Sequence, residues 1–113
     1  MGPSQEKTRS EEQAARNEVL FREANETLGE KRQALELDGQ TPFLCECEDP
    51  TCTELVRLEV DEYEHVRSHA NWFLVAAGHD DEQALHAESH EHYAIVEKSG
   101  LAGRIAEEEN PRR

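Results

Sequence analysis

The sequence predicts an α+β fold: a long N-terminal helix followed by a small, mostly antiparallel sheet with short helices. Apolar residues recur every seven positions in the first third of the chain, whereas they alternate with polar residues from about residue 43 onwards. Leu, Ile, Val and Phe contribute only 21 of the 113 residues, and 15 of those 21 lie between residues 43 and 105. A core this thin is commonly reinforced by a metal, by disulfides or by a partner.

The charge of the chain excludes several classes of function. It has 12 Lys and Arg against 26 Asp and Glu, a formal net charge of −14, which opposes direct contact with the phosphate backbone of a nucleic acid. No apolar run approaches the roughly 20 residues of a membrane span, and no charged-then-apolar leader opens the chain. We therefore expect a cytoplasmic protein that contacts neither a membrane nor a nucleic acid directly.

Residues 1–9 are predicted to be disordered, and residues 10–38 to form an amphipathic helix. Ser10 is an N-cap candidate with a Gln three residues on, and an Asp-Gly pair ends the helix. The apolar residues of the helix share the seven-residue spacing: Ala14, Phe21, Leu28 and Leu35. This face can pack on the rest of the protein or form the seam of a weak homodimer, with Asn17 and Lys31 at the other seam positions. Disorder of the whole segment is the third interpretation.

Residues 43–108 are predicted to form a small α+β domain, followed by a loose tail at residues 109–113. Its strands are predicted from apolar residues bounded by turn residues: Phe43–Cys47, Leu55–Val60, Trp72–Ala76 and Tyr93–Lys98. The segment Ala84–Glu88 follows an acidic turn at residues 80–82 and fits either a strand or a helix. Short helices are expected at two further places: Asp61–His69 and Leu101–Glu108.

Three cysteines lie within eight residues, in a C-x-C-x4-C pattern. Cys45 and Cys47 are two residues apart on a predicted strand, so their side chains point to the same side. The turn at Asp49–Pro50 then brings Cys52 back towards them. Three converging sulfurs suit a soft, tetrahedrally coordinated metal ion, and Zn²⁺ is the default for such ligands. We therefore expect one structural Zn²⁺ that staples this metal-binding domain.

A tetrahedral site needs a fourth ligand, and we select His79 from the six histidines. It follows an apolar strand and Gly78, which allows the backbone to come close. The neighbouring Asp80 could orient the imidazole. The remaining histidines are the other candidates: His65, His69, His86, His90 and His92.

Other states of the three cysteines stay open. They can be reduced thiols in a small core. Alternatively, Cys47 and Cys52 can form a disulfide with Cys45 unpaired, although an odd number of cysteines makes a disulfide framework a poor match. An iron–sulfur centre is a further alternative, because three Cys and one His resemble the ligand count of CDGSH-type domains. In those domains the His follows the last Cys by four residues, whereas His79 lies 27 residues after Cys52.

The pattern of motifs resembles a group of small actinobacterial proteins of uncharacterised function that carry C-x-C-x4-C and a later Gly-His. The resemblance covers residues 14–112 and implies a shared fold and motif set, without an activity. These residues carry it: Ala15–Glu18, Phe43–Cys47, Cys52, Glu62–Tyr63, Val66–Arg67, Phe73–Val75, Gly78–His79, Tyr93 and Glu97–Lys98.

Two other features have less specific interpretations. The stretch His86–His92 is expected to be a solvated acidic–histidine turn whose charge varies with pH, or a transition-metal site if His86 and His90 share a helical face. Trp72 and Phe73 are expected to anchor the core.

The sequence thus predicts a small acidic zinc-binding protein that acts as a non-enzymatic interaction or regulatory module. No P-loop, G-x-S-x-G or H-E-x-x-H motif is present, and a zinc closed by four protein ligands is structural; a zinc hydrolase would need an open position and a cleft. The acidic surface suggests a basic or nucleic-acid-binding protein as partner. The alternative is a thiol-based redox or metal sensor.

Overall fold

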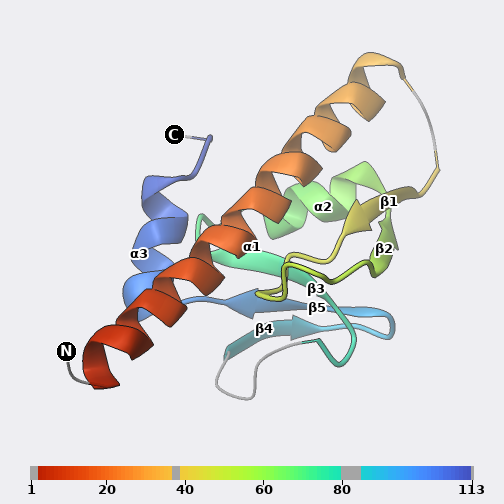
Figure 1. Cartoon of the computed structure of the whole chain (residues 1–113). Helices are drawn as coiled ribbons and strands as arrows, with labels where there is room; N and C mark the ends of the chain where they lie inside the picture. The colour runs from red at the N-terminus through yellow and green to blue at the C-terminus, as the bar shows by residue number, and fades with distance from the viewer. Residues whose placement is uncertain (1–2, 37–38, 80–84, 113) are drawn as a thin grey trace.

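The computed structural model describes residues 3–36, 39–79 and 85–112, and it confirms the α+β class (Figure 1). A long helix is followed by two small antiparallel sheets and two short helices within these residues. The elements occur in this order: α1 (Pro3–Ala34), β1 (Thr41–Leu44), β2 (Leu55–Leu58), α2 (Val60–Val66), β3 (Trp72–Ala76), β4 (Leu85–Ser89), β5 (Tyr93–Glu97) and α3 (Gly100–Glu108).

Helix α1 begins and ends earlier than the sequence suggests. It starts at Pro3 instead of Ser10 and ends at Ala34. Proline fits the first helical position because the N–H that it lacks would have no partner there. At the other end, Glu36 adopts a positive φ of 54°, which stops the helix. The expected stop signal partly lies at residues 37–38, outside the described residues.

The strands form two separate sheets. β1 pairs antiparallel with β2, and Phe43 lies opposite Val56. The second sheet has the order β3-β5-β4, and Leu74 lies opposite Ile95 at its centre. The ambiguous segment before residue 89 is a strand, β4, whose register with β5 is interrupted by a bulge between His86 and Glu88.

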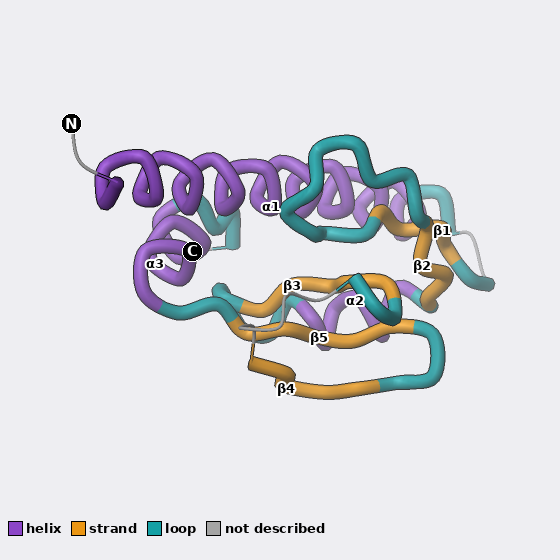
Figure 2. Tube along the Cα trace, turned by 60° about the horizontal axis from the view of Figure 1, so that its bottom comes forward, coloured by secondary structure: helices purple, strands orange, loops and turns teal. Residues whose placement is uncertain are grey.

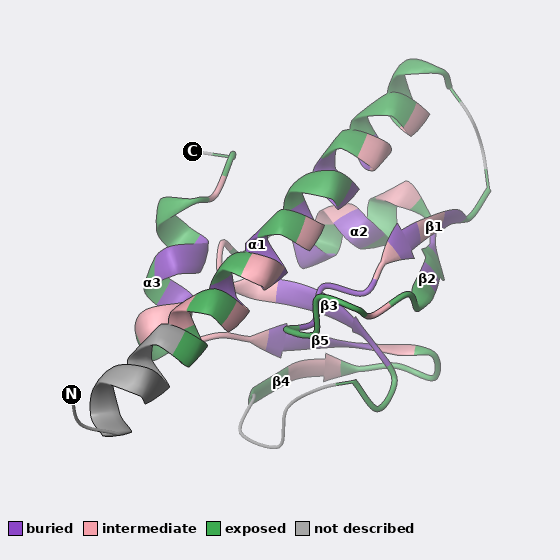
Figure 3. Cartoon of the chain, viewed as in Figure 1, coloured by how far each residue is buried: buried purple, intermediate pink, exposed green. Residues whose placement is uncertain are grey.

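Helix α1 lies over β3 and β5 in Figure 2, with α3 beside it, and Figure 3 shows the buried residues concentrated between these layers. β3 and β5 contribute seven of the 18 buried hydrophobic residues among those described, whereas β4 is the more exposed outer strand. Phe43 stacks on Tyr63 with ring centroids 4.4 Å apart, which joins β1 to α2. Of the two expected anchors, Phe73 is fully buried, but Trp72 is only half-buried.

The face that α1 buries is not the apolar seam that its spacing suggests. The four seam residues are half-buried or exposed, and the buried positions are instead largely polar: Ala15, Glu18, Val19, Arg22, Asn25, Glu26 and Gly29. Arg22 is fully buried and donates to the carbonyl oxygens of Ala70 and Ala106 at 2.7 and 2.8 Å. Glu18 pairs with Lys98 at 2.7 Å. The helix therefore docks through individually matched polar groups.

The C-terminal residues are tied to this interface. Arg112 contacts the carboxylates of Glu26 and Glu64, and Asn110 accepts a hydrogen bond from Arg67. The tail that the sequence suggests to be loose is held, in its described part, by ion pairs to α1 and α2.

Candidate metal centre

The three cysteines and His79 come together in one group. One ligand atom from each of Cys45, Cys47, Cys52 and His79 lies within 4.8 Å of every other. His79 Nδ1 is 3.5 Å from the sulfur of Cys52 and 3.8 Å from that of Cys45. All three cysteines are free. The residues that the C-x-C-x4-C pattern and the later Gly-His single out thus converge on one point.

The position of Cys45 and Cys47 follows from the open edge of β3. After β1 ends, the chain continues past β3: the Glu46 N–H donates to Leu74 O at 2.6 Å. On its other side, the Cys45 N–H donates to Glu54 O at 3.2 Å and extends the β1–β2 ladder. The cysteine segment therefore bridges the two sheets, and it covers backbone groups that an edge strand would otherwise leave unpaired.

Glu46, between the two cysteines, fixes the segment in place. Its side chain is fully buried and accepts three hydrogen bonds: from Asn25 Nδ2 at 2.9 Å, from Tyr63 Oη at 2.6 Å and from the Leu74 N–H at 2.9 Å. Burial raises the pKa of Glu46, although these three donors partly oppose the rise. Asn25 also exchanges hydrogen bonds with the Leu44 backbone at 2.8 Å in both directions. α1, α2 and β3 thus all hold the carboxyl that lies between two candidate ligands.

A tight turn returns Cys52 to the group. The Asp49 carboxylate accepts from the Thr51 N–H at 2.9 Å and from the Thr51 hydroxyl at 2.7 Å, and these hydrogen bonds lower the pKa of Asp49. The Cys52 N–H donates to Asp49 O at 3.1 Å. This is the Asx-type turn that an Asp-Pro-Thr sequence favours.

A second turn presents His79 from the opposite side. Gly78 has a φ of +83°, a conformation that residues with a side chain rarely adopt. The His79 N–H donates to Ala76 O at 3.0 Å and closes the turn at the end of β3. The imidazole is exposed, whereas Cys45 and Cys47 are buried. Asp80, which we expected to orient the imidazole, lies outside the described residues.

Burial of the sulfurs disfavours their negative charge. It raises the pKa of Cys45 and also that of Cys47. For Cys45, the Ala76 N–H opposes the rise by donating to the sulfur at 3.2 Å. Thiolates in such surroundings need a compensating positive charge, and a bound metal ion is the largest local charge that a protein can supply.

The separations of the ligand atoms fit a tetrahedral ion. With metal–sulfur bonds of about 2.3 Å and metal–nitrogen bonds of about 2.0 Å, the edges of a tetrahedral site measure roughly 3.5–3.8 Å. The sulfur–nitrogen edges are the shorter ones, at about 3.5 Å. The separation of His79 Nδ1 from the Cys52 sulfur, 3.5 Å, matches this edge, and its separation from the Cys45 sulfur, 3.8 Å, is slightly longer. The group could therefore hold a metal ion.

An open cavity of about 280 Å³ adjoins the group. The Glu18–Lys98 pair lies in its wall, with Cys47, Asp49 and His79. Burial raises the pKa of Glu18, whereas Lys98 opposes the rise. All four candidate ligands come from the chain itself, so the cavity offers no evident free position on an ion held by them.

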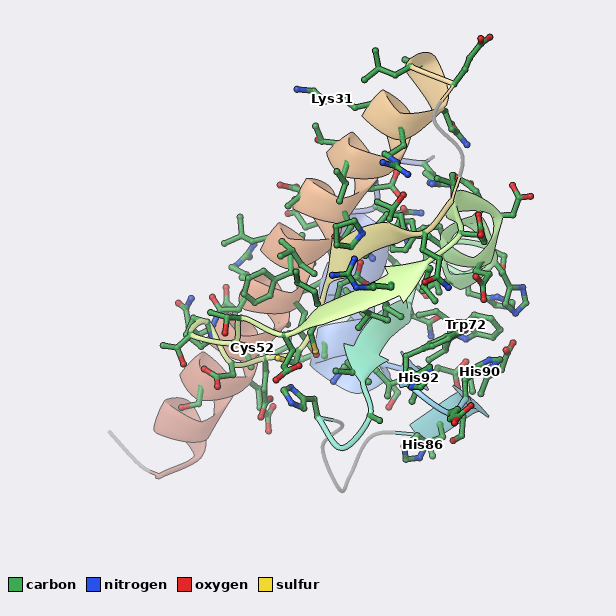
Figure 4. All side chains as sticks on the ribbon, turned by 90° about the vertical axis from the view of Figure 1, so that its right-hand side faces the viewer. Lys31, Cys52, Trp72, His86, His90 and His92 are labelled. Atoms are coloured by element: carbon green, nitrogen blue, oxygen red, sulfur yellow. The ribbon has the colours of Figure 1, made fainter. Side chains whose placement is uncertain are left out.

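None of the other five histidines belongs to the group. Figure 4 shows His86, His90 and His92 at one side of the view, with Cys52 at the other. His69 stacks on Trp72 with centroids 3.7 Å apart, and His65 approaches the same ring edge-on at 5.7 Å.

Sequence reasoning missed the residues that support the group, above all Glu46 and Asn25. A charged residue that alternates with two cysteines would be assigned to the solvent side of a strand. Its burial depends on partners in α1, α2 and β3, which no local pattern indicates.

Comparisons with protein-family models, with curated proteins and with solved structures found no match for this chain. Among the described residues, no helix combines the length and the apolar character needed to cross a membrane.

Proposed function

We propose that this chain is a small acidic zinc-binding protein in which Cys45, Cys47, Cys52 and His79 hold one structural Zn²⁺ ion. The observation that carries the proposal is the convergence of three sulfurs and one imidazole nitrogen within 4.8 Å of one another, with the nitrogen 3.5 and 3.8 Å from two of the sulfurs. The donor set favours zinc, because thiolate and imidazole ligands select soft or borderline ions over Mg²⁺ or Ca²⁺.

The ion would strengthen the cysteine loop, which connects β1 to β2. Each of these strands has only four residues, and the loop between them is exposed at positions 48–51. Bound zinc would link this loop to the turn after β3. Its binding free energy would then add to folding stability, as in other small domains with structural zinc.

Elemental analysis of protein purified without added metal tests the site directly. We expect about one zinc per chain, lost in Cys45→Ser and much reduced in His79→Ala, with a lower Tm in both variants. His92→Ala is the matched control, because it removes an exposed histidine outside the group. Zinc content that is the same in His79→Ala as in the control would overturn the ligand assignment. Protein purified free of metal that cannot be reloaded would overturn the zinc site.

We further propose that the zinc-stapled domain is a non-enzymatic module that binds a basic protein, including one whose own ligand is a nucleic acid. Between residues 43 and 105 the chain carries 14 acidic against 4 basic residues, a net charge of −10. Acidic side chains around the cysteine loop are exposed, among them Glu48, Asp49 and Glu54. Such a field speeds association with a positively charged partner and weakens with added salt.

An affinity experiment in extract of the native cell tests the interaction. Immobilised protein should retain basic proteins at low salt and release them at about 0.5 M salt, since screening shortens the reach of surface charges. Binding should persist in His92→Ala and fall in Cys45→Ser. Retention that is independent of salt, or unchanged in Cys45→Ser, would argue against this interaction.

One observation favours a second candidate function, a thiol-based redox or metal sensor. Cys52 is half-buried and His79 is exposed, so the group reaches the surface on one side. A thiolate there could attack a peroxide, which breaks the O–O bond, releases hydroxide and leaves a sulfenic acid; the oxidised sulfur would then release the ion. Zinc release by substoichiometric peroxide, reversed by a thiol reductant, would support the sensor; a brown protein with visible absorption would indicate iron–sulfur in place of zinc.

A further inference from the structure

A second cluster of metal-binding side chains lies at the surface between α2 and β4. His65 belongs to α2, Glu88 to β4 and His90 to the turn that follows β4. The Nε2 atom of His65 contacts Glu88 Oε2, and Nε2 of His90 lies 2.9 Å from Glu88 Oε1. Two imidazoles from separate parts of the chain therefore point their nitrogens at one carboxylate.

Aromatic neighbours hold both imidazole rings. His65 meets Trp72 edge-on, with centroids 5.7 Å apart, and His90 stacks on Tyr93 at 4.4 Å and 11°. The backbone fixes the turn as well, because the His90 N–H donates to Tyr93 O at 2.8 Å. Rings restrained in this way lose less freedom when they bind a ligand.

The bulge in β4 explains how the carboxylate reaches this position. His86 lies opposite Val96 and Glu88 lies opposite Ile95, so one extra residue of β4 is accommodated between the two pairs. Such a bulge redirects the side chains that follow it, and bulges are frequent beside functional sites. Without it, the alternation of the strand would carry a different residue to this face.

The surroundings are negatively charged. Burial raises the pKa of Tyr93, and the carboxylates of Glu62 and Glu88 raise it further. In contrast, hydrogen bonds from His65 and His90 lower the pKa of Glu88.

We propose that His65, Glu88 and His90 form a second, exchangeable site for a divalent transition-metal ion. Two imidazole nitrogens and a carboxylate suit Zn²⁺, Ni²⁺ or Co²⁺, whereas Mg²⁺ and Ca²⁺ prefer oxygen ligands alone. The side chains are 53%, 31% and 40% exposed, respectively. An ion bound by the two nitrogens and the carboxylate would replace the hydrogen bonds that now join them, and water can reach its remaining positions. This site would differ from the cysteine group, whose ligands are four protein side chains.

Nickel titration of the protein after zinc loading tests the site. We expect the wild-type chain to take up one Ni²⁺, measured by calorimetry and by quenching of its single Trp, which contacts His65. His65→Ala and His90→Ala should each weaken binding at least about tenfold, and Glu88→Gln should weaken it as well. His92→Ala is the matched control, since it removes an exposed imidazole next to the site.

Near-ultraviolet absorption separates the two sites, because only Ni²⁺ bound to sulfur gives thiolate charge-transfer bands. Nickel uptake with quenching and without these bands supports the surface site, whatever the metal content of the cysteine group. Equal affinities in His65→Ala and the wild type would overturn the proposal. An equal loss in His65→Ala and His92→Ala would do the same, because it would indicate adventitious binding to surface histidines only.

Discussion

The face of α1 and the face of the β3–β5 pair stabilise the same interior in different ways. The strands contribute apolar side chains that exclude water, such as Phe73 and Val75, both buried. The helix contributes Arg22, Asn25 and Glu26, and each of them has a specific hydrogen-bond partner. Apolar contacts tolerate small shifts of register, whereas a buried guanidinium or carboxylate is stable only opposite its partner. The sheet therefore contributes chiefly through burial of apolar surface, and the helix is held in one defined position.

The largest effect is expected on the apolar side of this comparison. Ile95→Ala removes a fully buried side chain from the central strand, so it should lower the free energy of unfolding by about 4 kcal/mol through lost burial and the cavity left behind. If this variant fails to fold, Ile95→Val should cost about 1 kcal/mol. Denaturant unfolding measures both. A loss below about 0.5 kcal/mol in both variants would contradict the role given to the sheet.

Arg22 tests the polar side. Arg22→Ala should cost about 3 kcal/mol, because the carbonyl groups of Ala70 and Ala106 lose the donor that satisfies them. Arg22→Met is the sharper variant, because it keeps an apolar side chain of similar length and removes only the guanidinium. In the wild type this guanidinium lies over the Phe73 ring, 4.9 Å from the ring centroid. Equal losses in the two variants, measured by thermal and denaturant unfolding, show that hydrogen bonding holds the helix. Full recovery in Arg22→Met would show that packing does.

Glu26 should make the stability of the α1 interface depend on pH. Burial disfavours its carboxylate, but hydrogen bonds from Arg112 and Arg67 outweigh burial and hold its pKa below the usual value. Its contribution is thus fully present above the ordinary Glu pKa of about 4.3 and is lost as the pH falls through the lowered value. Glu26→Gln should cost about 1.5 kcal/mol at pH 7.

The pH profile distinguishes this contribution from simple loss of packing. The difference in unfolding free energy between Glu26→Gln and the wild type should shrink as the pH falls below about 4. Glu23→Gln is the control, because Glu23 is an exposed residue of the same helix. A difference that stays constant from pH 7 to pH 3 would exclude the lowered pKa as its origin.

The smallest effect is expected at the exposed side of α1. Arg16 lies 3.2 Å from Glu12 and 3.7 Å from Glu109, and the three side chains are about half exposed. Water and salt screen such pairs, so Arg16→Ala should change the unfolding free energy by less than about 0.5 kcal/mol. A loss comparable to that of Arg22→Ala would remove the distinction between the buried and the exposed polar contacts of the helix.

The same distinction explains which parts of the structure could be predicted from the sequence. β3 matches its expected bounds, and β5 differs by one residue, because continuous apolar residues between turn residues indicate a buried strand. The cysteine–histidine group could also be anticipated. Its sulfurs are close in the chain, and Gly78 indicates the turn that precedes His79.

The buried face of α1 could not be predicted. The partners of Arg22 lie 48 and 84 residues away, and those of Glu26 include residues 41 and 86 positions on. A pattern that classifies residues as apolar or polar assigns these side chains to solvent, and the heptad of apolar residues then appears to be the packing face. The predicted ends of β1 and β2 also differ from the observed ones. The first strand is predicted to reach Cys47, but β1 ends at Leu44 and the cysteine segment continues past β3. The second is predicted to reach Val60, but Val60 begins α2.

The composition of the α1 face has a consequence for the intact chain in the cell. If thermal motion lifts the helix from the sheet, most of what it uncovers on itself is charge and amide, which water solvates well. The separated helix offers neighbouring molecules little apolar surface on which to aggregate. Opening would also uncover apolar side chains of β3 and β5. In a partly opened chain, the surface on which other molecules could associate would therefore belong to the sheet and not to the helix.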